Sequence, residues 1–259
     1  MITLRSKREI SLMQKPGAVV WEAHQAAAKL VEPGVSTMEL ENAVDAVFKK
    51  YDAIPLFKGV PGKIPFPAVT CISVNEEVVH GIPGSRVLKE GDIVSLDTGC
   101  KIKGWCGDAA VTHAVGAISE QAQRLLEITQ GALQTAIDLM ETKQRWSEVA
   151  IEMQRHVEES GFSVVTAFVG HGIGRELHED PQVPNYFKES FLKDGDFQLR
   201  PGLVVAVEPM ANIGKPEVKV TADHWTQVTC DGSLSAHFEH TLALTANGVE
   251  VLTGQPQKS

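Results

Sequence analysis

Four acidic residues adjoin short apolar runs that are typical of buried strands. Asp97 and Glu208 each end such a run, whereas Asp108 and Glu239 each open the run that follows. Burying a carboxylate is costly unless it is paired or bound to a metal ion, and four converging carboxylates would repel one another and take up protons. An oxygen-rich set of ligands favours hard ions such as manganese or iron(II) over a structural zinc site. We therefore expect two divalent ions about 3.5–4 Å apart, as in two-metal hydrolases.

Three histidines are candidates for the nitrogen groups of such a site. His171 and His178 stand in one glycine-rich run, and glycines allow the backbone to approach a bound ion or substrate closely. His80 ends a strand-like run in the first half of the chain, so we expect it and His178 to flank the site from opposite sides. The other histidines fit helical spacing or strand alternation and are expected to be structural: His24, His113, His156, His224, His237 and His240.

An internal repeat relates the two halves of the chain. The runs Gly91–Asp97 and Gly202–Glu208 each consist of a glycine, a β-type run and an acid six positions after the glycine, at an offset of 111 residues. The apolar spacing that begins at Ser36 returns at Trp146, at a similar offset. If the halves pack about a two-fold axis, both pairs of acids point at one central position.

Helices and loops must position these side chains. Apolar residues recur every three or four positions in four segments, Ser6–Val31, Thr37–Tyr51, Ser119–Met140 and Trp146–Ser160. The proline-rich stretches Ile54–Pro67 and Asp180–Pro201 are expected to be irregular surface connections. We predict an α+β fold with a curved antiparallel sheet inside and helices outside. One catalytic domain, 1–259, is expected, with halves of roughly 1–116 and 117–259.

Composition and charge exclude several classes of protein. With 43% hydrophobic and 22% charged residues the chain is expected to be globular, and a net charge of −9 argues against nucleic acid as the main partner. No apolar run approaches the roughly 20 residues that span a bilayer, and no secretory signal is expected, because no apolar stretch follows the basic N-terminus. The four cysteines form no CxxC pair and are expected to be reduced.

Five runs, in this order along the chain, together form a highly specific pattern. They are VVHGIP, SLDTGCKIKGWCGDAA, GHGIGRELHEDPQVPNY, VVAVEPM and SLSAHFEHT. With them the chain resembles the type I methionine aminopeptidases from about Ile10 to Leu252. Leu177 stands where an aromatic residue is common in that family, and the segment before Cys71 offers Phe66 in place of tyrosines. The resemblance implies the pita-bread (creatinase/aminopeptidase) fold, whose pseudo-symmetric halves agree with the repeat.

The resemblance also implies a role for each candidate residue. It implies that Asp108 and Glu239 bridge two metal ions. The full set of implied metal ligands is Asp97, Asp108, His171, Glu208 and Glu239. It implies that His80 and His178 contact the substrate, that His178 stabilises the oxyanion, and that Glu208 is also the general base, with His80 the next candidate. Trp225, Phe66 and Cys71 are the expected wall of a methionine pocket.

By the same resemblance, the chain removes the initiator methionine from nascent polypeptides when the second residue is small. Its expected cofactors are two divalent ions, iron(II), manganese or cobalt. A cytoplasmic monomer without DNA or membrane partners is expected, and Arg5, Lys7 and Arg8 are either a solvated helix start or a transient contact with ribosomal RNA. Two alternatives stay open: an Xaa-Pro aminopeptidase or prolidase of the same fold, and a metal-free binding protein of that fold.

Overall fold

The computed structural model describes residues 2–256. It contains four long helices, which form in the four segments that the sequence predicts to be helical. They are α1 (Lys7–Ala28), α2 (Thr37–Lys50), α3 (Glu120–Leu139) and α4 (Trp146–Glu158). The backbone N–H groups of Ser6 and Ser36 donate to Glu9 and Glu39 at 2.8 Å. These capping boxes satisfy N–H groups at the starts of α1 and α2. Within residues 2–256, no helix has the length and apolar character needed to cross a membrane.

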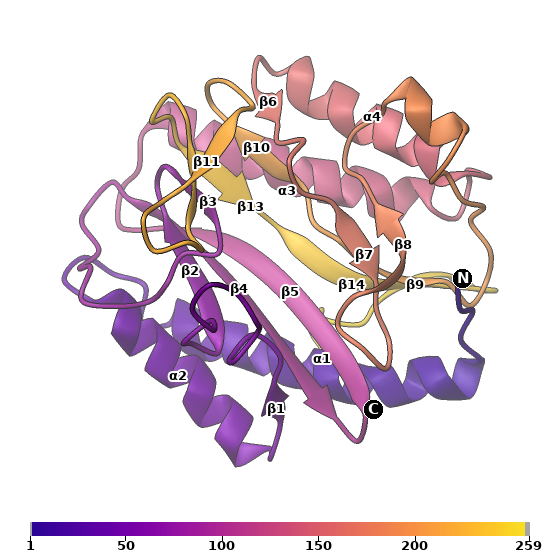
Figure 1. The fold of residues 1–259 in the computed structure, drawn as a ribbon, viewed down its shortest axis with the longest axis horizontal. Helices are drawn as coiled ribbons and strands as arrows, with labels where there is room; N and C mark the ends of the chain where they lie inside the picture. Colours follow the sequence, from indigo (N-terminus) through magenta and orange to yellow (C-terminus); the bar gives the residue numbers. More distant parts are fainter. Residues whose placement is uncertain (1, 257–259) are drawn as a thin grey trace.

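A nine-stranded antiparallel sheet forms the centre of the molecule (Figure 1). Its main path runs β1–β4–β5–β14–β9–β7–β8, while β2 pairs with β4 and β15 pairs with β14. The strands are β1 (Ile54–Pro55), β2 (Thr70–Val74), β4 (Ile93–Ile102), β5 (Trp105–Ala114), β7 (Gly170–Gly172), β8 (Glu179–Val183), β9 (Val204–Val207), β14 (Glu239–Thr245) and β15 (Gly248–Val251). Strand β5 of the first half of the chain and strand β14 of the second half therefore pair at the centre of the sheet.

Two three-stranded sheets and a short helical turn complete the described fold. One sheet has the order β13–β10–β6 and the other the order β11–β12–β3. Their strands are β3 (Glu77–Val79), β6 (Ser163–Val164), β10 (Met210–Asn212), β11 (Val218–Val220), β12 (Gln227–Thr229) and β13 (Ser235–His237), and the 3-10 helix η1 spans Glu189–Leu192. Because β12 pairs with β3, the second sheet joins the two halves of the chain beside His80.

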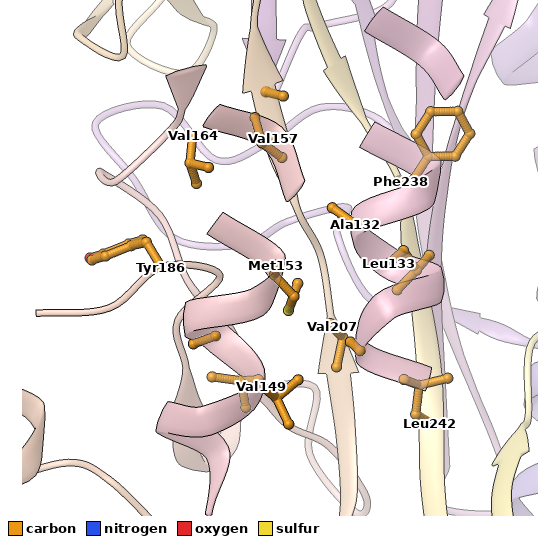
Figure 2. Close-up of a cluster of buried hydrophobic side chains, with 14 of the residues drawn as sticks. Ala132, Leu133, Val149, Met153, Val157, Val164, Tyr186, Val207, Phe238 and Leu242 are labelled. Atoms are coloured by element: carbon orange, nitrogen blue, oxygen red, sulfur yellow. The ribbon is translucent and has the colours of Figure 1, made fainter. Parts of the chain in front are cut away.

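The apolar core lies between the helices and the sheet. Figure 2 shows Val149 and Met153 of α4 and Leu133 of α3 near Val207 of β9 and Leu242 of β14, and all five side chains are buried. A second cluster joins α1 and α2 to β2 and β4 and includes Val20, Leu40, Phe48, Ile72 and Leu96. In the view of Figure 1, α1 and α2 lie below the central strands and α3 and α4 above them.

Two predicted irregular connections contain strands, so those predictions are wrong in part. Ile54 and Pro55 form β1 against the end of β4. Residues Glu179–Val183 form β8 at the edge of the sheet, paired with β7. An edge strand needs ladder hydrogen bonds on one side only, so it accommodates Pro181, which has no N–H to donate.

Asp97 and Asp108 lie inside strands and not at strand ends, contrary to the sequence pattern. The reason is that β4 pairs with β5 over its whole length, as far as Ile102. This pairing satisfies the backbone of both strands past the acidic residues. Glu208 does directly follow β9, and Glu239 is the first residue of β14, as predicted.

Candidate metal centre

Five candidate ligands meet at one pocket of about 120 Å³. They come from β4, β5, β7, β14 and the residue after β9: Asp97, Asp108, His171, Glu208 and Glu239. Potential ligand atoms of Asp108, His171 and Glu239 all lie within 4.8 Å of one another. The Nε2 atom of His171 is 3.9 Å from Oδ2 of Asp108 and 3.6 Å from Oε1 of Glu208. The sheet therefore brings together acids that are far apart in the sequence.

Asp108 and Glu239 of this cluster are buried, and Asp97 and Glu208 are half-buried. One oxygen each of Asp97, Asp108 and Glu239 is buried and accepts no hydrogen bond from the described residues. Burial raises the pKa of all three carboxyls and of Glu208, and their mutual repulsion adds to the rise for Asp97, Glu208 and Glu239. Divalent cations would remove both costs. The donor set, four carboxylates and one imidazole, thus fits hard divalent ions.

His171 presents a neutral nitrogen to the cluster. Its Nδ1 atom lies 3.0 Å from the carbonyl oxygen of Gly172, and a carbonyl oxygen only accepts, so Nδ1 carries the proton. Burial lowers the pKa of His171 to about 4. Its Nε2 atom is therefore unprotonated at neutral pH and faces Asp108 and Glu208 as a metal ligand would.

Neighbouring polar groups hold two of the carboxylate residues in place. The Thr241 hydroxyl donates to the carbonyl oxygen of Asp108 at 2.8 Å and accepts from its N–H at 3.0 Å. The Asn185 amide donates to the carbonyl oxygen of Glu208 at 3.0 Å. Because these contacts use backbone groups of Asp108 and Glu208, both carboxylates stay free to bind a cation.

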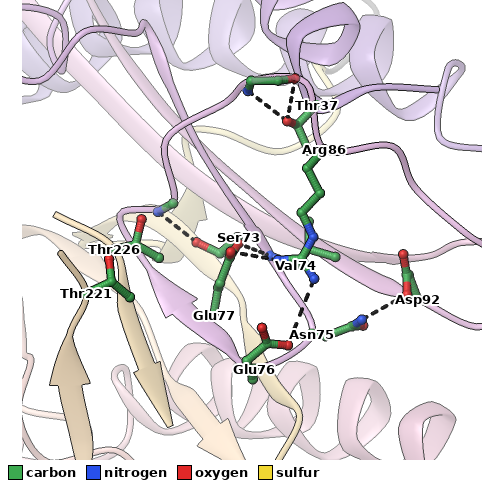
Figure 3. Close-up of polar contacts among 12 residues, drawn as sticks. Thr37, Ser73, Val74, Asn75, Glu76, Glu77, Arg86, Asp92, Thr221 and Thr226 are labelled. Carbon is green, nitrogen blue, oxygen red and sulfur yellow. Dashed lines mark hydrogen bonds and ion pairs between the residues drawn. The ribbon is translucent and has the colours of Figure 1, made fainter. Parts of the chain in front are cut away.

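Figure 3 shows a polar network that includes Ser73, Glu77 and Arg86, which flank His80 in the sequence. His80 has a φ of 60°, which is uncommon for a residue other than glycine. The next residue, Gly81, donates from its N–H to the Ser73 hydroxyl at 3.1 Å and accepts from the Ile72 N–H at 2.8 Å. Arg86 donates to Glu77 at 2.7 Å and so ties the following loop to β3. These contacts hold the backbone around His80 while its ring lines the pocket.

His178 lies at the mouth of the pocket, in the turn between β7 and β8. Its ring centroid is 4.4 Å from that of His171, edge to face, and the residue is exposed. Partial burial of the ring lowers the pKa of His178, which favours the neutral imidazole with its one N–H donor. The structure thus brings His178 and His80 to the same pocket.

Apolar side chains form the rest of the pocket wall. They include the three predicted residues and three others: Phe66, Cys71, Trp225, Phe57, Val60 and Leu177. The rings of Phe66 and Trp225 are 5.3 Å apart, and the indole N–H of Trp225 donates to the carbonyl oxygen of Ile64 at 2.7 Å. Sequence reasoning missed Phe57 and Val60, although large apolar residues in a stretch rich in proline and glycine are a sign of a loop that covers a pocket.

The histidines expected to be structural do not line this pocket in the described part of the chain. His24 is buried in α1 and donates from Nε2 to the carbonyl oxygen of Ala109 at 2.9 Å. Burial lowers the pKa of His24 to about 4 and that of His237 to about 3. The four cysteines are free thiols, as expected: Cys71, Cys100, Cys106 and Cys230.

Comparisons with known proteins agree with this geometry. Residues 11–246 match the model of metallopeptidase family M24. Methionine aminopeptidase 1 of Bacillus subtilis (strain 168) is 46% identical over 253 residues, which cover 98% of this chain and 99% of the relative. The crystal structure of methionine aminopeptidase from Thermotoga maritima has a TM-score of 0.92 at 44% identity and covers 98% of this chain and 100% of its own.

Fold and site together define a metallopeptidase of family M24, with the predicted α+β pita-bread fold and its curled antiparallel sheet. Within that family the chain belongs to the methionine aminopeptidases. Prolidase from Pyrococcus furiosus shares the fold at a TM-score of 0.73, but it is 20% identical and this chain covers 66% of its length. The alternative of a prolidase-like enzyme therefore has support from the fold alone.

Proposed function

We propose that this chain hydrolyses the peptide bond after an N-terminal methionine, using two divalent ions held by the five clustered side chains. The observation that carries the proposal is the convergence of four carboxylates, two of them buried and two half-buried, and one neutral imidazole in a single pocket. Three of those carboxylates keep an oxygen without a hydrogen-bond donor among the described residues. A site with this excess of buried negative charge is stabilised by cations, which argues against a metal-free binding protein.

The five predicted residues would hold the ions. Asp108 and Glu239 would act together in this site, because Glu239 of β14 pairs with Ala110 of β5, two residues from Asp108. When bound, the ions supply an activated water and polarise the scissile carbonyl. Manganese, iron(II) and cobalt all suit this donor set, so the ion used in the cell depends on availability as well as on affinity.

The chain's own residues move the protons and hold the substrate. Glu208 accepts a proton from the attacking water and passes it to the leaving amine. His178, with its one N–H donor, stabilises the oxyanion. His80 contacts the substrate from the opposite side, and it is the next candidate for the base. The apolar wall of Phe66, Cys71 and its neighbours takes the methionine side chain.

We also propose that the second residue of the substrate must be small. His80 and His178 both line the pocket with the metal ligands, so a large side chain next to the scissile bond would contact one of these rings. The proposed substrates are the N-termini of nascent proteins, and the name methionine aminopeptidase of the relative supports a terminal methionine. This specificity predicts release of methionine from Met-Ala, Met-Gly and Met-Ser termini and very slow release from Met-Lys or Met-Ile.

The remaining predictions concern organisation and location. We propose that 1–259 act as one catalytic domain, supported by the contribution of ligands from both predicted halves. A cytoplasmic monomer is consistent with the free thiols, since disulfides are rare in that compartment. Transient ribosome contact stays a prediction for Lys7 and Arg8, whose side chains are exposed.

A comparison of two peptides tests the proposal. Met-Ala-Ser and Ala-Pro are incubated side by side with enzyme freed of metal by a chelator and then supplied with manganese, cobalt or iron(II). We expect methionine release from Met-Ala-Ser that requires the added metal, and no cleavage of Ala-Pro. Preferential cleavage of Ala-Pro would support the prolidase alternative, and no cleavage of either peptide with any metal would support a binding protein.

A further inference from the structure

Arg5, just before α1, is buried, although the sequence predicts a solvated basic helix start. The exposed fraction of its side chain is 8%. Its backbone N–H donates to the carbonyl oxygen of Gly202 at 2.6 Å, which anchors the N-terminal segment beside β9. The side chain of Arg5 therefore points into the protein, and the expectation of a solvated Arg5 is wrong.

The partner of Arg5 is Glu179, at the start of β8. Nη2 of Arg5 forms an ion pair with Oε2 of Glu179. The other carboxylate oxygen, Oε1, accepts from the backbone N–H groups of Arg175 at 2.7 Å and Glu176 at 3.1 Å. Glu179 thus connects the N-terminal segment to the turn that joins β7 to β8.

The same turn has a second set of contacts with the β4–β5 hairpin. Arg175 donates to the carbonyl oxygen of Gly104 at 3.2 Å, and its guanidinium lies 3.7 Å from the centre of the buried Trp105 ring. The guanidinium of Arg5 lies 5.4 Å from the same ring. A Cβ on Gly174 would lie too close to Nη2 of Arg5, so a larger residue at this position would displace the Arg5 side chain. The turn is shaped around the guanidinium of Arg5.

This turn carries two residues of the pocket. Leu177 lines the pocket wall, and His178 lies at the mouth with its ring 4.4 Å from that of His171. No hydrogen bond to the ring of His178 is found among the described residues, so its direction depends on the backbone of the turn. A displacement of that backbone by about 1 Å is enough to lower a catalytic rate by about 10².

We propose that Arg5 is a positioning residue for the reaction, acting through Glu179 on the turn Gly174–His178 and so on the direction of the His178 ring. The inference rests on the proposed oxyanion role of His178. It adds that Arg5, which is far from His178 in the sequence, helps to fix the direction of the His178 ring. The N-terminal segment is then part of the support of the active site and does more than lead into α1.

Three single variants test the ion pair. Arg5→Met keeps the length of the side chain and removes its charge, while Arg5→Lys keeps the charge and loses the planar donor group. Lys101→Met is the matched control, because Lys101 forms an ion pair with Glu176 of the same turn at 3.0 Å but Glu176 is exposed. We expect kcat for Met-Ala-Ser to fall by about 10–10² in Arg5→Met, to recover in part in Arg5→Lys, and to change less than about twofold in Lys101→Met.

A double-variant cycle separates positioning from general damage to the fold. If Arg5 acts through His178, Arg5→Met lowers kcat little further once His178→Ala is present. Independent effects that multiply would overturn the proposal, since a merely structural role predicts them. An equal loss of kcat in Lys101→Met would also overturn it.

Amide hydrogen exchange tests the hold of Arg5 on the turn without relying on activity. We expect the amides of residues 174–178 to exchange faster in Arg5→Met, with the amides of α3 and α4 unchanged. Unchanged exchange in the turn would contradict the proposal. If the turn loosens as expected but His178→Ala keeps full activity, the coupling of Arg5 to the turn stands, and the proposed oxyanion role of His178 is what fails.

Discussion

Nε2 of His171 lies 3.6 Å from Oε1 of Glu208. The two residues belong to neighbouring strands, because His171 of β7 is paired with Ala206 of β9, two residues before Glu208. This register puts an imidazole and a carboxylate on the same face of the sheet, beside one pocket. The pairing of β7 with β9 therefore brings the imidazole nitrogen of His171 and the carboxylate oxygens of Glu208 into one site.

Glu208 has two proposed roles, as a metal ligand and as the group that transfers a proton. Glu208→Gln keeps the size of the side chain and removes its charge and basicity. We expect the variant to fold normally and to lose at least about 10³ in kcat, because loss of a general base costs about 10²–10⁴ and the metal site is also disturbed. Metal analysis and kinetics on one sample check this. Activity above a tenth of wild type with two bound metals would exclude Glu208 as the base and favour His80.

His178 tests the oxyanion role separately from metal binding. Removing one donor to an oxyanion costs about 10²–10³ in kcat, so His178→Ala should lose activity by this factor and keep its metal. The measurement is kcat for Met-Ala-Ser together with metal content per chain. A variant that lost both metals would show that His178 is a ligand and that its assigned role is wrong.

Trp225 holds the loop over the pocket through one hydrogen bond. Trp225→Phe keeps an aromatic ring near Phe66 but removes the N–H that donates to the carbonyl oxygen of Ile64 at 2.7 Å. A hydrogen bond of this kind contributes about 0.5–1.5 kcal/mol. We expect KM for Met-Ala-Ser to rise by about 2- to 12-fold with little change in kcat. A large fall in kcat with unchanged KM would contradict a role restricted to the pocket wall.

Removal of the metal ions should make stability depend on pH through the clustered acids. Burial raises the pKa of Asp97, Glu208 and Glu239, and that of Asp108 to about 7. A carboxyl whose pKa is higher in the folded chain stabilises the fold fully below its unfolded pKa of about 4. That contribution is lost as the pH rises through the folded pKa.

We therefore expect the Tm of chelator-treated protein to fall as the pH rises from about 5 to about 8, because these acids ionise in that range. The control is Glu239→Gln, which cannot titrate at this position and should show a smaller pH dependence. Saturating manganese should raise the Tm more at pH 8 than at pH 5. Identical pH dependence of the two metal-free proteins would contradict the account of these carboxyls.

The sequence predicted the helices and the ligand cluster because both leave local patterns. Apolar spacing marks a helix such as α3, and an acid beside an apolar run marks a buried carboxylate, as at Glu239. The sequence could not predict the partner of Arg5, because Glu179 is 174 residues away and nothing near either residue indicates the other. Strand β8 was missed since Pro181 and the prolines after the strand are typical of a loop, and only the place of β8 at the sheet edge makes Pro181 acceptable.

Anomalous diffraction from a crystal soaked in manganese tests the central claim most directly. The account predicts two peaks about 3.5–4 Å apart, both inside the pocket, with Asp108 and Glu239 between them and His171 at one. A single peak, or peaks outside the pocket formed by these residues, would contradict the assignment of a two-metal peptidase site to this cluster.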